Sequence, residues 1–192
     1  QTYGYRDVEK RLPMDRNSIC RAYSMSKIIS CVATLVLFEE GRFNLDDPVA
    51  NYLPELKNMK AWTGGTQDAP QLEPLKRPIT IKHLLTHTSG LMYDFAGEDE
   101  LTKLWRGAEL WSGPGLTNFI AKLAKLPLKH QPGDAYTYGV NQDVLGALIE
   151  RVSGKPFGAF LGERIFLPLG MKDTGFDVPE AKMNRLAKTY KH

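Results

Sequence analysis

The residues of this chain best suited to chemistry are Ser24 and Lys27, which lie three positions apart. Apolar residues recur at helical spacing from Met25 to Phe38 and fill much of the circumference, which predicts a helix enclosed on most sides. Ser24 would lie in its first turn, where free N–H groups favour a developing negative charge. Lys27 would project from the same face, and lost solvation would lower its pKa from about 10.4, so that it could act as a base. A weak nucleophile beside a base is the minimum requirement for covalent acyl transfer.

The same pair of residues also has a purely structural explanation. A Ser/Thr-x-x-Lys pattern is expected about once by chance in a chain of this length and average composition. Serine is a common capping residue at helix starts, and a lysine can extend its ammonium group from a half-buried position into solvent. The spacing alone therefore leaves both interpretations open.

Two tyrosines form a second candidate for proton transfer. Tyr136 and Tyr138 follow the turn predicted at Pro132-Gly133 and precede an apolar helix. A tyrosine can assist proton transfer when a nearby cation lowers its pKa from about 10. Tyrosines in such positions are also common packing residues with a satisfied hydroxyl, so this candidate stays open as well.

The histidines are weaker candidates. His83 and His87 have the i, i+4 spacing of one helix face, but the zinc-protease pattern requires Glu after the first histidine and this chain has Leu84. No further ligands cluster nearby in the sequence, so a metal site is not favoured. A Ser–His–Asp triad is not favoured either, because the chain contains no Gly-x-Ser-x-Gly elbow.

The elements that would position these residues are mostly helices. Residues 1–7 alternate like a strand, residues 57–79 read as a long loop, and Thr80 is the expected N-cap of a short helix. Further helices are expected at 101–111, 116–126, 144–152 (ended by Gly154) and from 156 to 166, with a short helix or extended piece at 49–56.

Length and composition exclude several classes of protein. The chain has 192 residues, 42% of them hydrophobic and 24% charged, which fits one ordinary globular domain or two small ones and excludes a disordered protein. Its net charge is +3 and like charges do not cluster, so no nucleic-acid partner is predicted. The longest nearly apolar stretch, 28–38, is too short for a membrane span.

The cysteines and the first residues bear on the cellular compartment. Cys20 and Cys31 are expected to be too far apart for a disulfide and to be buried free thiols. No basic segment followed by an apolar one is visible at the start of the chain, so no signal peptide is predicted. The sequence leaves the compartment open, with the cytoplasm preferred.

Several blocks of sequence together identify a family resemblance. They are, in chain order, Tyr23-Ser-Met-Ser-Lys27, Glu40-Gly-Arg-Phe-Asn-Leu-Asp-Asp-Pro48, Tyr52-Leu-Pro54, Ile79-Thr-Ile-Lys-His-Leu-Leu-Thr-His-Thr-Ser-Gly-Leu91, Pro132-Gly-Asp-Ala-Tyr-Thr-Tyr138, Asp143-Val-Leu-Gly146, Pro168-Leu-Gly-Met171 and Asp173-Thr174. They resemble the serine β-lactamase and penicillin-binding-protein superfamily, and most closely its class C β-lactamase-like carboxylesterases (family VIII) and β-lactamase-related hydrolases. The resemblance implies an α+β fold of the β-lactamase/DD-peptidase type.

The resemblance also assigns roles to three residues. Ser24 matches the nucleophile that accepts the acyl group, and Lys27 matches the base that pairs with it. Tyr138, six residues after Pro132, matches the proton relay, which leaves Tyr136 as a packing neighbour. The backbone N–H of Ser24 would supply half of an oxyanion hole.

This chain departs from the family pattern in two places. Class C β-lactamases carry Asn two residues after the tyrosine, where it contacts the lactam side chain, and this chain has Val140. The third motif of the family, Lys-Thr-Gly or a His/Trp-Gly-Gly strand, has no match before His192. Residues 1–192 are therefore expected to be a partial catalytic domain that covers mainly the helical region, with the first helix and strand and the C-terminal strands absent.

The function expected from these observations is hydrolysis of small carboxylic esters through an acyl-serine intermediate, with acyl transfer to another alcohol as a related activity. It would require no metal and no organic cofactor. The alternatives are a β-lactamase or DD-peptidase type of amide hydrolase and a non-catalytic homologue or fragment that lacks the third motif. The sequence leaves the oligomeric state and the natural acyl group open.

Overall fold

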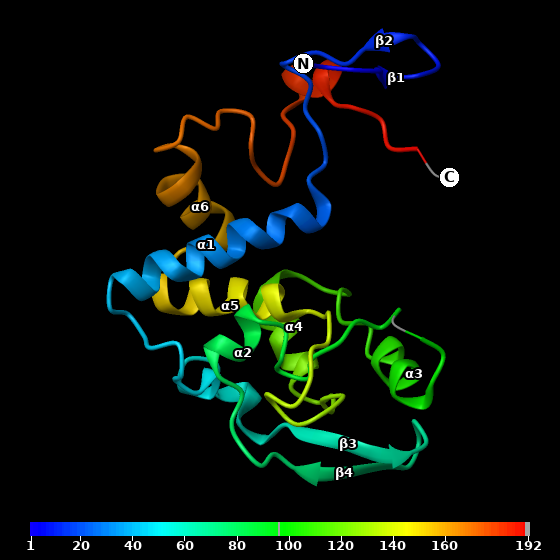
Figure 1. The fold of residues 1–192 in the computed structure, drawn as a ribbon, viewed down its shortest axis with the longest axis vertical. Helices are drawn as coiled ribbons and strands as arrows, with labels where there is room; N and C mark the ends of the chain where they lie inside the picture. Colours follow the sequence, from blue (N-terminus) through cyan, green and yellow to red (C-terminus); the bar gives the residue numbers. More distant parts are fainter. Residues whose placement is uncertain (96, 191–192) are drawn as a thin grey trace.

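The computed structural model describes residues 1–95 and 97–190, and most of its regular structure is helical (Figure 1). The strands are β1 (Tyr5–Asp7), β2 (Leu12–Pro13), β3 (Lys60–Gly65) and β4 (Pro70–Pro74). The α-helices are α1 (Ser26–Glu39), α2 (Ile81–Leu85), α3 (Glu100–Gly107), α4 (Gly115–Leu123), α5 (Asn141–Ser153) and α6 (Phe157–Leu161). Short 3-10 helices lie at Tyr23–Met25, Val49–Asn51, Pro54–Asn58 and Glu180–Arg185, and a π-helical turn at Gly162–Phe166.

Helix α5 is the centre of the core. Its side chains Val144, Leu145, Leu148 and Ile149 are fully buried, and α1, α2, α4 and α6 all pack against it (Figure 1). The helix ends at Gly154, which adopts the left-handed conformation with φ 70° that favours glycine after a helix. The predicted helix at 144–152 and its glycine cap are confirmed.

The predicted enclosure of helix α1 is wrong for the described structure. Its buried residues, Ser30, Ala33, Thr34 and Leu37, lie on one side, and α1 packs against α5. Apolar side chains elsewhere on the helix remain in solvent, with Ile28 67% exposed. Apolar residues occupy most of the circumference of α1, but in the described structure other elements pack against only part of that surface.

The predicted loop at 57–79 contains a hairpin instead. β3 and β4 pair antiparallel, with Trp62 opposite Leu72, and the amide of Trp62 also donates to the carbonyl of Leu128 at 2.8 Å. Pro70 and Pro74 are the first and last residues of β4, positions in which a strand tolerates proline. Gly64 and Gly65 at the end of β3, and Pro70 and Pro74 at the ends of β4, therefore lie where short strands accept such residues.

The predicted N-cap of helix α2 is confirmed. The hydroxyl of Thr80 accepts from the amide of His83, and the ring Nδ1 of His83 accepts from the amide of Thr80, which makes a reciprocal capping box. The helix ends at Leu85, and His87 lies beyond it with φ 56°. The two histidines therefore do not share a helix face, and His83 is used to start the helix.

The ends of the described chain pair with each other. The amide of Ala187 donates to the carbonyl of Ile19, and that of Lys188 donates to the carbonyl of Arg6. Figure 1 shows the C-terminal segment running beside β1 and β2, apart from the helical body. Within the described residues no helix is both long and apolar enough to cross a membrane.

The two cysteines are free, as predicted, but neither is fully buried. Cys20 is exposed and Cys31 is half-buried. Cys20 precedes the 3-10 turn in an extended segment, where the sequence offers little apolar material to cover it. The expectation of two buried thiols is therefore wrong.

Candidate active site

Ser24 lies in a single 3-10 turn, Tyr23–Met25, immediately before α1. Tyr23 has φ 44°, in the left-handed region that few residues other than glycine occupy. Such backbone strain tends to occur at functional sites. The tight turn leaves the Ser24 side chain exposed at the N-terminal end of α1, close to the position predicted from the sequence.

The structure brings Ser24, Lys27 and Tyr138 together. The Oγ of Ser24 accepts a hydrogen bond from the Nζ of Lys27 at 3.2 Å and another from the hydroxyl of Tyr138 at 2.9 Å. Lys27 reaches Ser24 because residues three apart lie on one side of the turn. Tyr138 comes from the segment just before α5, which the packing of α1 on α5 places beside Ser24.

Tyr136 lies differently from Tyr138. Its side chain is 66% exposed and its ring is 5.7 Å from that of His87. Within the described ranges it makes no hydrogen bond to Ser24 or Lys27, whereas Tyr138 does bond to Ser24. Of the two tyrosines, the structure therefore places only Tyr138 within reach of the nucleophile candidate.

The electrostatics of Lys27 differ from the sequence-based expectation. Partial burial disfavours its charged form, but the hydroxyls of Tyr138 and Tyr93 outweigh this effect, and the pKa of Lys27 lies above its ordinary value. Its Nζ is 5.0 Å from the ring centroid of Tyr138 and 5.7 Å from that of Tyr93, which favours a cation. The environment of Lys27 therefore favours its ammonium form, the opposite of the lowered pKa expected from burial alone.

Tyr138 is shifted in the complementary direction. Its hydrogen bonding with Lys27, and next with Ser24, lowers the pKa of its phenol below the ordinary value, although some burial opposes this. A cation beside a phenol stabilises the ionised phenolate and so lowers the pKa of the phenol. Lys27 and Tyr138 therefore each favour the charged form of the other.

One acidic residue at this site was missed as a candidate. Asp143, in the first turn of α5, is half-buried, and burial raises its pKa to about 6 despite the opposing charge of Lys27. Its negative charge in turn raises the pKa of Tyr93 and opposes the lowering at Tyr138. The sequence block that begins at Asp143 was visible, but nothing in its spacing indicated that the carboxylate would face Lys27.

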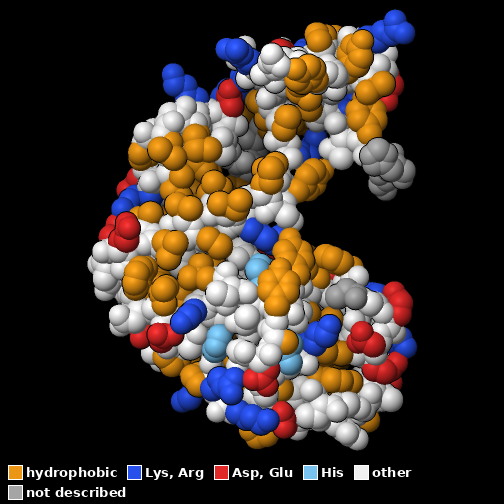
Figure 2. Space-filling model, viewed as in Figure 1, with side chains coloured by type: hydrophobic (Ala, Val, Ile, Leu, Met, Phe, Trp, Pro, Cys, Tyr) orange, Lys and Arg blue, Asp and Glu red, His pale blue; other side chains and the backbone are white. Residues whose placement is uncertain are grey.

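Aromatic side chains surround the three residues. Tyr93 stacks on Phe95 with ring centroids 4.8 Å apart, and its ring is 5.4 Å from that of Tyr138. Phe95 is 71% exposed and so offers an aromatic face to solvent beside the site. Figure 2 shows that the molecule is hollowed between the helical body and the paired end segments, with hydrophobic side chains along the hollow.

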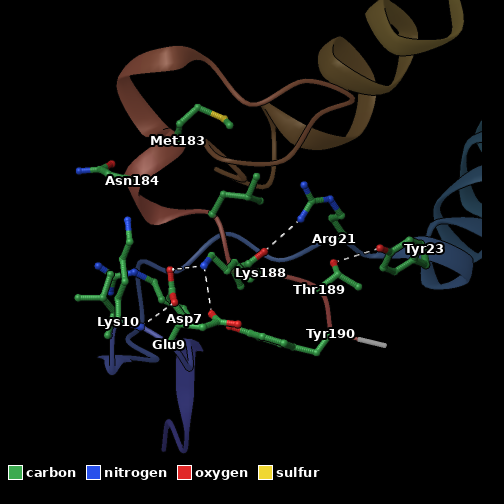
Figure 3. A pocket seen from close by; sticks show the side chains of 14 residues that line it. Asp7, Glu9, Lys10, Arg21, Tyr23, Met183, Asn184, Lys188, Thr189 and Tyr190 are labelled. Carbon is green, nitrogen blue, oxygen red and sulfur yellow. Dashed lines mark hydrogen bonds and ion pairs between the residues drawn. The ribbon is translucent and has the colours of Figure 1, made fainter. Parts of the chain in front are cut away.

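A second hollow lies farther along the paired ends (Figure 3). It has a volume of about 900 Å³ and is lined by β1 residues and the C-terminal segment. Three of the charged side chains that line it pair with one another, since Lys188 lies 3.0 Å from Asp7 and 3.1 Å from Glu9. Ser24, Lys27 and Tyr138 do not line it.

Comparison with known proteins decides the family. A family model described as "Beta-lactamase" matches residues 1–192, the whole chain. The chain belongs to the beta-lactamase family. The family predicted from the sequence blocks is thereby confirmed.

Relatives of this beta-lactamase-family chain include named esterases. It is 35% identical to esterase EstB of Burkholderia gladioli over 97% of this chain and 45% of EstB. It is 34% identical to lovastatin esterase of Penicillium rubens over 87% of this chain and 42% of that esterase. Protein Rv1367c of Mycobacterium tuberculosis is 37% identical over 98% of this chain and 46% of that protein. The chain therefore spans less than half the length of these relatives.

Solved structures give the same result for the fold. Unliganded simvastatin synthase (LovD) from Aspergillus terreus matches with a TM-score of 0.83 and 31% identity, over 97% of this chain and 49% of that one. EstCE1, a hydrolase with promiscuous acyltransferase activity, matches with a TM-score of 0.79 and 30% identity, over 97% of this chain and 46% of that one. The β-lactamase/DD-peptidase-like fold, rich in helices and poor in strands over this region, is confirmed.

The residue two positions after Tyr138, where the resemblance to class C β-lactamases leads one to expect Asn, lies in the core of this beta-lactamase-family chain. Val140 is buried, with 1% of its surface exposed, and precedes α5 as its N-cap. Its side chain therefore packs in the core and offers no amide group to Ser24 and its neighbours. The next residue, Asn141, is also buried, and its amide bonds to Ser89 and His87.

Gly139 allows the segment that carries Tyr138 to lie against a neighbouring loop. A Cβ at this position would lie 2.3 Å from the carbonyl oxygen of Leu91 and 2.6 Å from the Cα of Met92. Because backbone atoms cannot move aside cheaply, we expect Gly139→Ala to lower the free energy of unfolding by about 1–3 kcal/mol in urea denaturation. Gly107→Ala, where an added Cβ meets nothing within 4 Å, is the matched control and should leave stability unchanged or slightly higher. Equal stability of the two variants would contradict the close approach.

Proposed function

We propose that this protein cleaves carboxylic esters through an acyl intermediate on Ser24. The observation that carries the proposal is that the Oγ of Ser24 lies 2.9 Å from the hydroxyl of Tyr138 and 3.2 Å from the Nζ of Lys27. A hydroxyl held by a proton acceptor and a cation is the arrangement that nucleophilic catalysis requires. The names of the relatives, which include esterases and acyltransferases, support the same class of reaction.

The first half of the reaction would form the acyl-enzyme. In its reactive form Tyr138 is ionised and accepts the proton of the Ser24 hydroxyl, while the ammonium of Lys27 stabilises the phenolate. The oxygen of Ser24 attacks the carbonyl carbon, and the backbone N–H of Ser24 is proposed to donate to the resulting oxyanion. Collapse of the tetrahedral intermediate breaks the ester bond, and the leaving alcohol takes the proton from Tyr138.

The second half would release the acyl group by the same steps in reverse. A water molecule gives its proton to Tyr138 as its oxygen attacks the acyl carbonyl, and Ser24 leaves with that proton. If an alcohol attacks in place of water, the product is a new ester and the reaction is acyl transfer. This second outcome is included because the relatives include acyltransferase mokF of Monascus pilosus, 33% identical over 97% of this chain.

The substrate class is proposed to be simple esters in preference to β-lactams. The support is Val140, whose side chain is buried where class C β-lactamases carry a lactam-contacting Asn. We expect kcat/KM for p-nitrophenyl butyrate to exceed that for benzylpenicillin by at least ~10²-fold, since an unfilled polar contact in a binding site costs a few kcal/mol.

The measurement is steady-state hydrolysis of both compounds by the natural protein that contains this sequence. Ser24→Ala serves as the blank for each substrate, so that only turnover dependent on Ser24 is compared. A kcat/KM for the lactam equal to or above that for the ester would contradict the ester preference and favour the amide-hydrolase alternative.

A further inference from the structure

A buried chain of hydrogen bonds leads from the core to the back of Tyr138. The amide of Leu91 donates to the Oγ of Ser89 at 3.1 Å, and the hydroxyl of Ser89 donates to the Oδ1 of Asn141 at 2.5 Å. Ser89 and Asn141 are both fully buried. Because the Oδ1 is used by Ser89, the Nδ2 of Asn141 is the atom directed at His87, where it lies 2.9 Å from the ring Nδ1.

The ring of His87 is thereby fixed in one protonation state. The backbone N–H of Gly139 also points at Nδ1, at 3.4 Å, and a backbone N–H can only donate. With two donors aimed at it, Nδ1 must carry a lone pair, so the imidazole is neutral with its proton on Nε2. Burial, and next the charge of Lys27, lower the pKa of His87 below its ordinary value, in agreement with a neutral ring.

This neutral ring lies directly against Tyr138. The two ring centroids are 5.1 Å apart with 31° between the planes, and on another side His87 meets the ring of Tyr136 at 5.7 Å. The carbonyl of His87 accepts from the amide of Thr137 at 2.8 Å, so that the backbone before Tyr138 is held as well. These contacts hold His87 at φ 56°, a strained backbone conformation for a residue other than glycine.

We propose that His87 is a positioning residue for Tyr138: as a neutral imidazole locked by Asn141 and Gly139, it holds the phenol within reach of Ser24. The inference rests on the proposed function, because it assigns His87 a role only through the hydroxyl of Tyr138. The charged and titratable groups that face His87 are Lys27 from α1 and the two tyrosines of the segment before α5. A proton on Nδ1 would oppose both N–H donors, and an imidazolium, with both nitrogens protonated, would also add a second cation beside Lys27.

A double-mutant cycle tests this role. His87→Gln should lower kcat for p-nitrophenyl butyrate by about 10–10²-fold with KM nearly unchanged, since a displaced catalytic group of this kind costs up to ~10²-fold. In a Tyr138→Phe background the same change should cost less than about 2-fold, because the hydroxyl it positions is already absent. The control is His83→Gln, the same substitution in the same motif, which preserves the capping box and should leave kcat unchanged.

The outcomes separate the two proposals. If Tyr138→Phe does not lower kcat, the proposed function fails at its proton relay. If Tyr138→Phe lowers kcat but His87→Gln does not, or if the two losses multiply, the positioning role is overturned while the proposed function stands.

A second measurement does not depend on the folding of His87→Gln or Tyr138→Phe. Long-range nitrogen–proton correlation spectra of the unaltered protein, labelled at histidine, should show Nδ1 of His87 unprotonated and Nε2 protonated at neutral pH. The resonances would be assigned by comparison with spectra of His83→Gln and His130→Gln. An imidazolium, or a proton on Nδ1, would overturn the inference.

Discussion

Replacing Ser24 by alanine should abolish ester hydrolysis, with a loss of kcat on the order of 10⁶-fold, as is found when the nucleophile of a serine hydrolase is removed. The reason is chemical, because without Oγ no acyl-enzyme can form, whatever the state of Tyr138 and Lys27. Ser24 is exposed and its hydroxyl accepts from those two side chains. We therefore expect the fold to survive, with a melting temperature within about 2 °C of the unaltered protein by the usual scaling for small stability changes.

The matched control for this change is Ser26→Ala. Ser26 is an exposed serine two residues farther on, at the first position of α1. The same atom is removed from the same segment, so any general effect of the substitution on the helix start should appear in both variants. Turnover by Ser24→Ala at more than a small fraction of the rate of Ser26→Ala would remove Ser24 from the mechanism.

Removing only the hydroxyl of Tyr138 should lower kcat by about 10²–10⁴-fold, the usual contribution of a positioned acid–base group. Tyr138→Phe retains the ring that packs between His87 and Tyr93. It loses the oxygen that lies 2.9 Å from the Oγ of Ser24. The comparison is with Tyr136→Phe, whose hydroxyl lies away from Ser24 in an exposed side chain and should leave kcat nearly unchanged.

The pH profile gives a further test of the role of Tyr138. Lys27 lowers the pKa of this phenol, so kcat/KM should rise with pH as the phenol ionises, at a pH below that of an ordinary tyrosine. The rising limb should disappear in Tyr138→Phe and stay in Tyr136→Phe. A larger loss for Tyr136→Phe than for Tyr138→Phe would show that the wrong tyrosine has been assigned.

Much of the helical part of the fold follows from local sequence signals. The apolar spacing at 144–152 with Gly154 behind it predicted α5, and Thr80 predicted the start of α2, because periodicity and capping are properties of neighbouring residues. The hairpin of β3 and β4 did not follow. Its strands are short, end in glycine or proline, and are held partly by Leu128, which is distant in the sequence.

Residue types and spacing in the sequence, together with the family resemblance, were enough to predict that Ser24, Lys27 and Tyr138 lie together. Ser24 and Lys27 are near neighbours on one turn, so their proximity was visible in the sequence, and the offset from Pro132 selected Tyr138 by resemblance. The pKa of Lys27 was not predictable, because its direction depends on two tyrosine hydroxyls brought in by tertiary packing.

The role of His87 was hidden for a similar reason. Its spacing from His83 suggested one helix face, but α2 ends between them and the ring turns toward Asn141 and Tyr138. A polar network of this kind depends on side chains far apart in the chain, and periodicity carries no information about it.

The most direct test of the central claim is covalent labelling of the nucleophile. The natural protein that contains this sequence would be treated with a fluorophosphonate, its intact mass measured, and the modified peptide sequenced by tandem mass spectrometry. The account predicts one adduct per chain, located on Ser24, absent from Ser24→Ala, present in Ser26→Ala and formed more slowly in Tyr138→Phe. An adduct on another residue, or labelling that persists in Ser24→Ala, would contradict it.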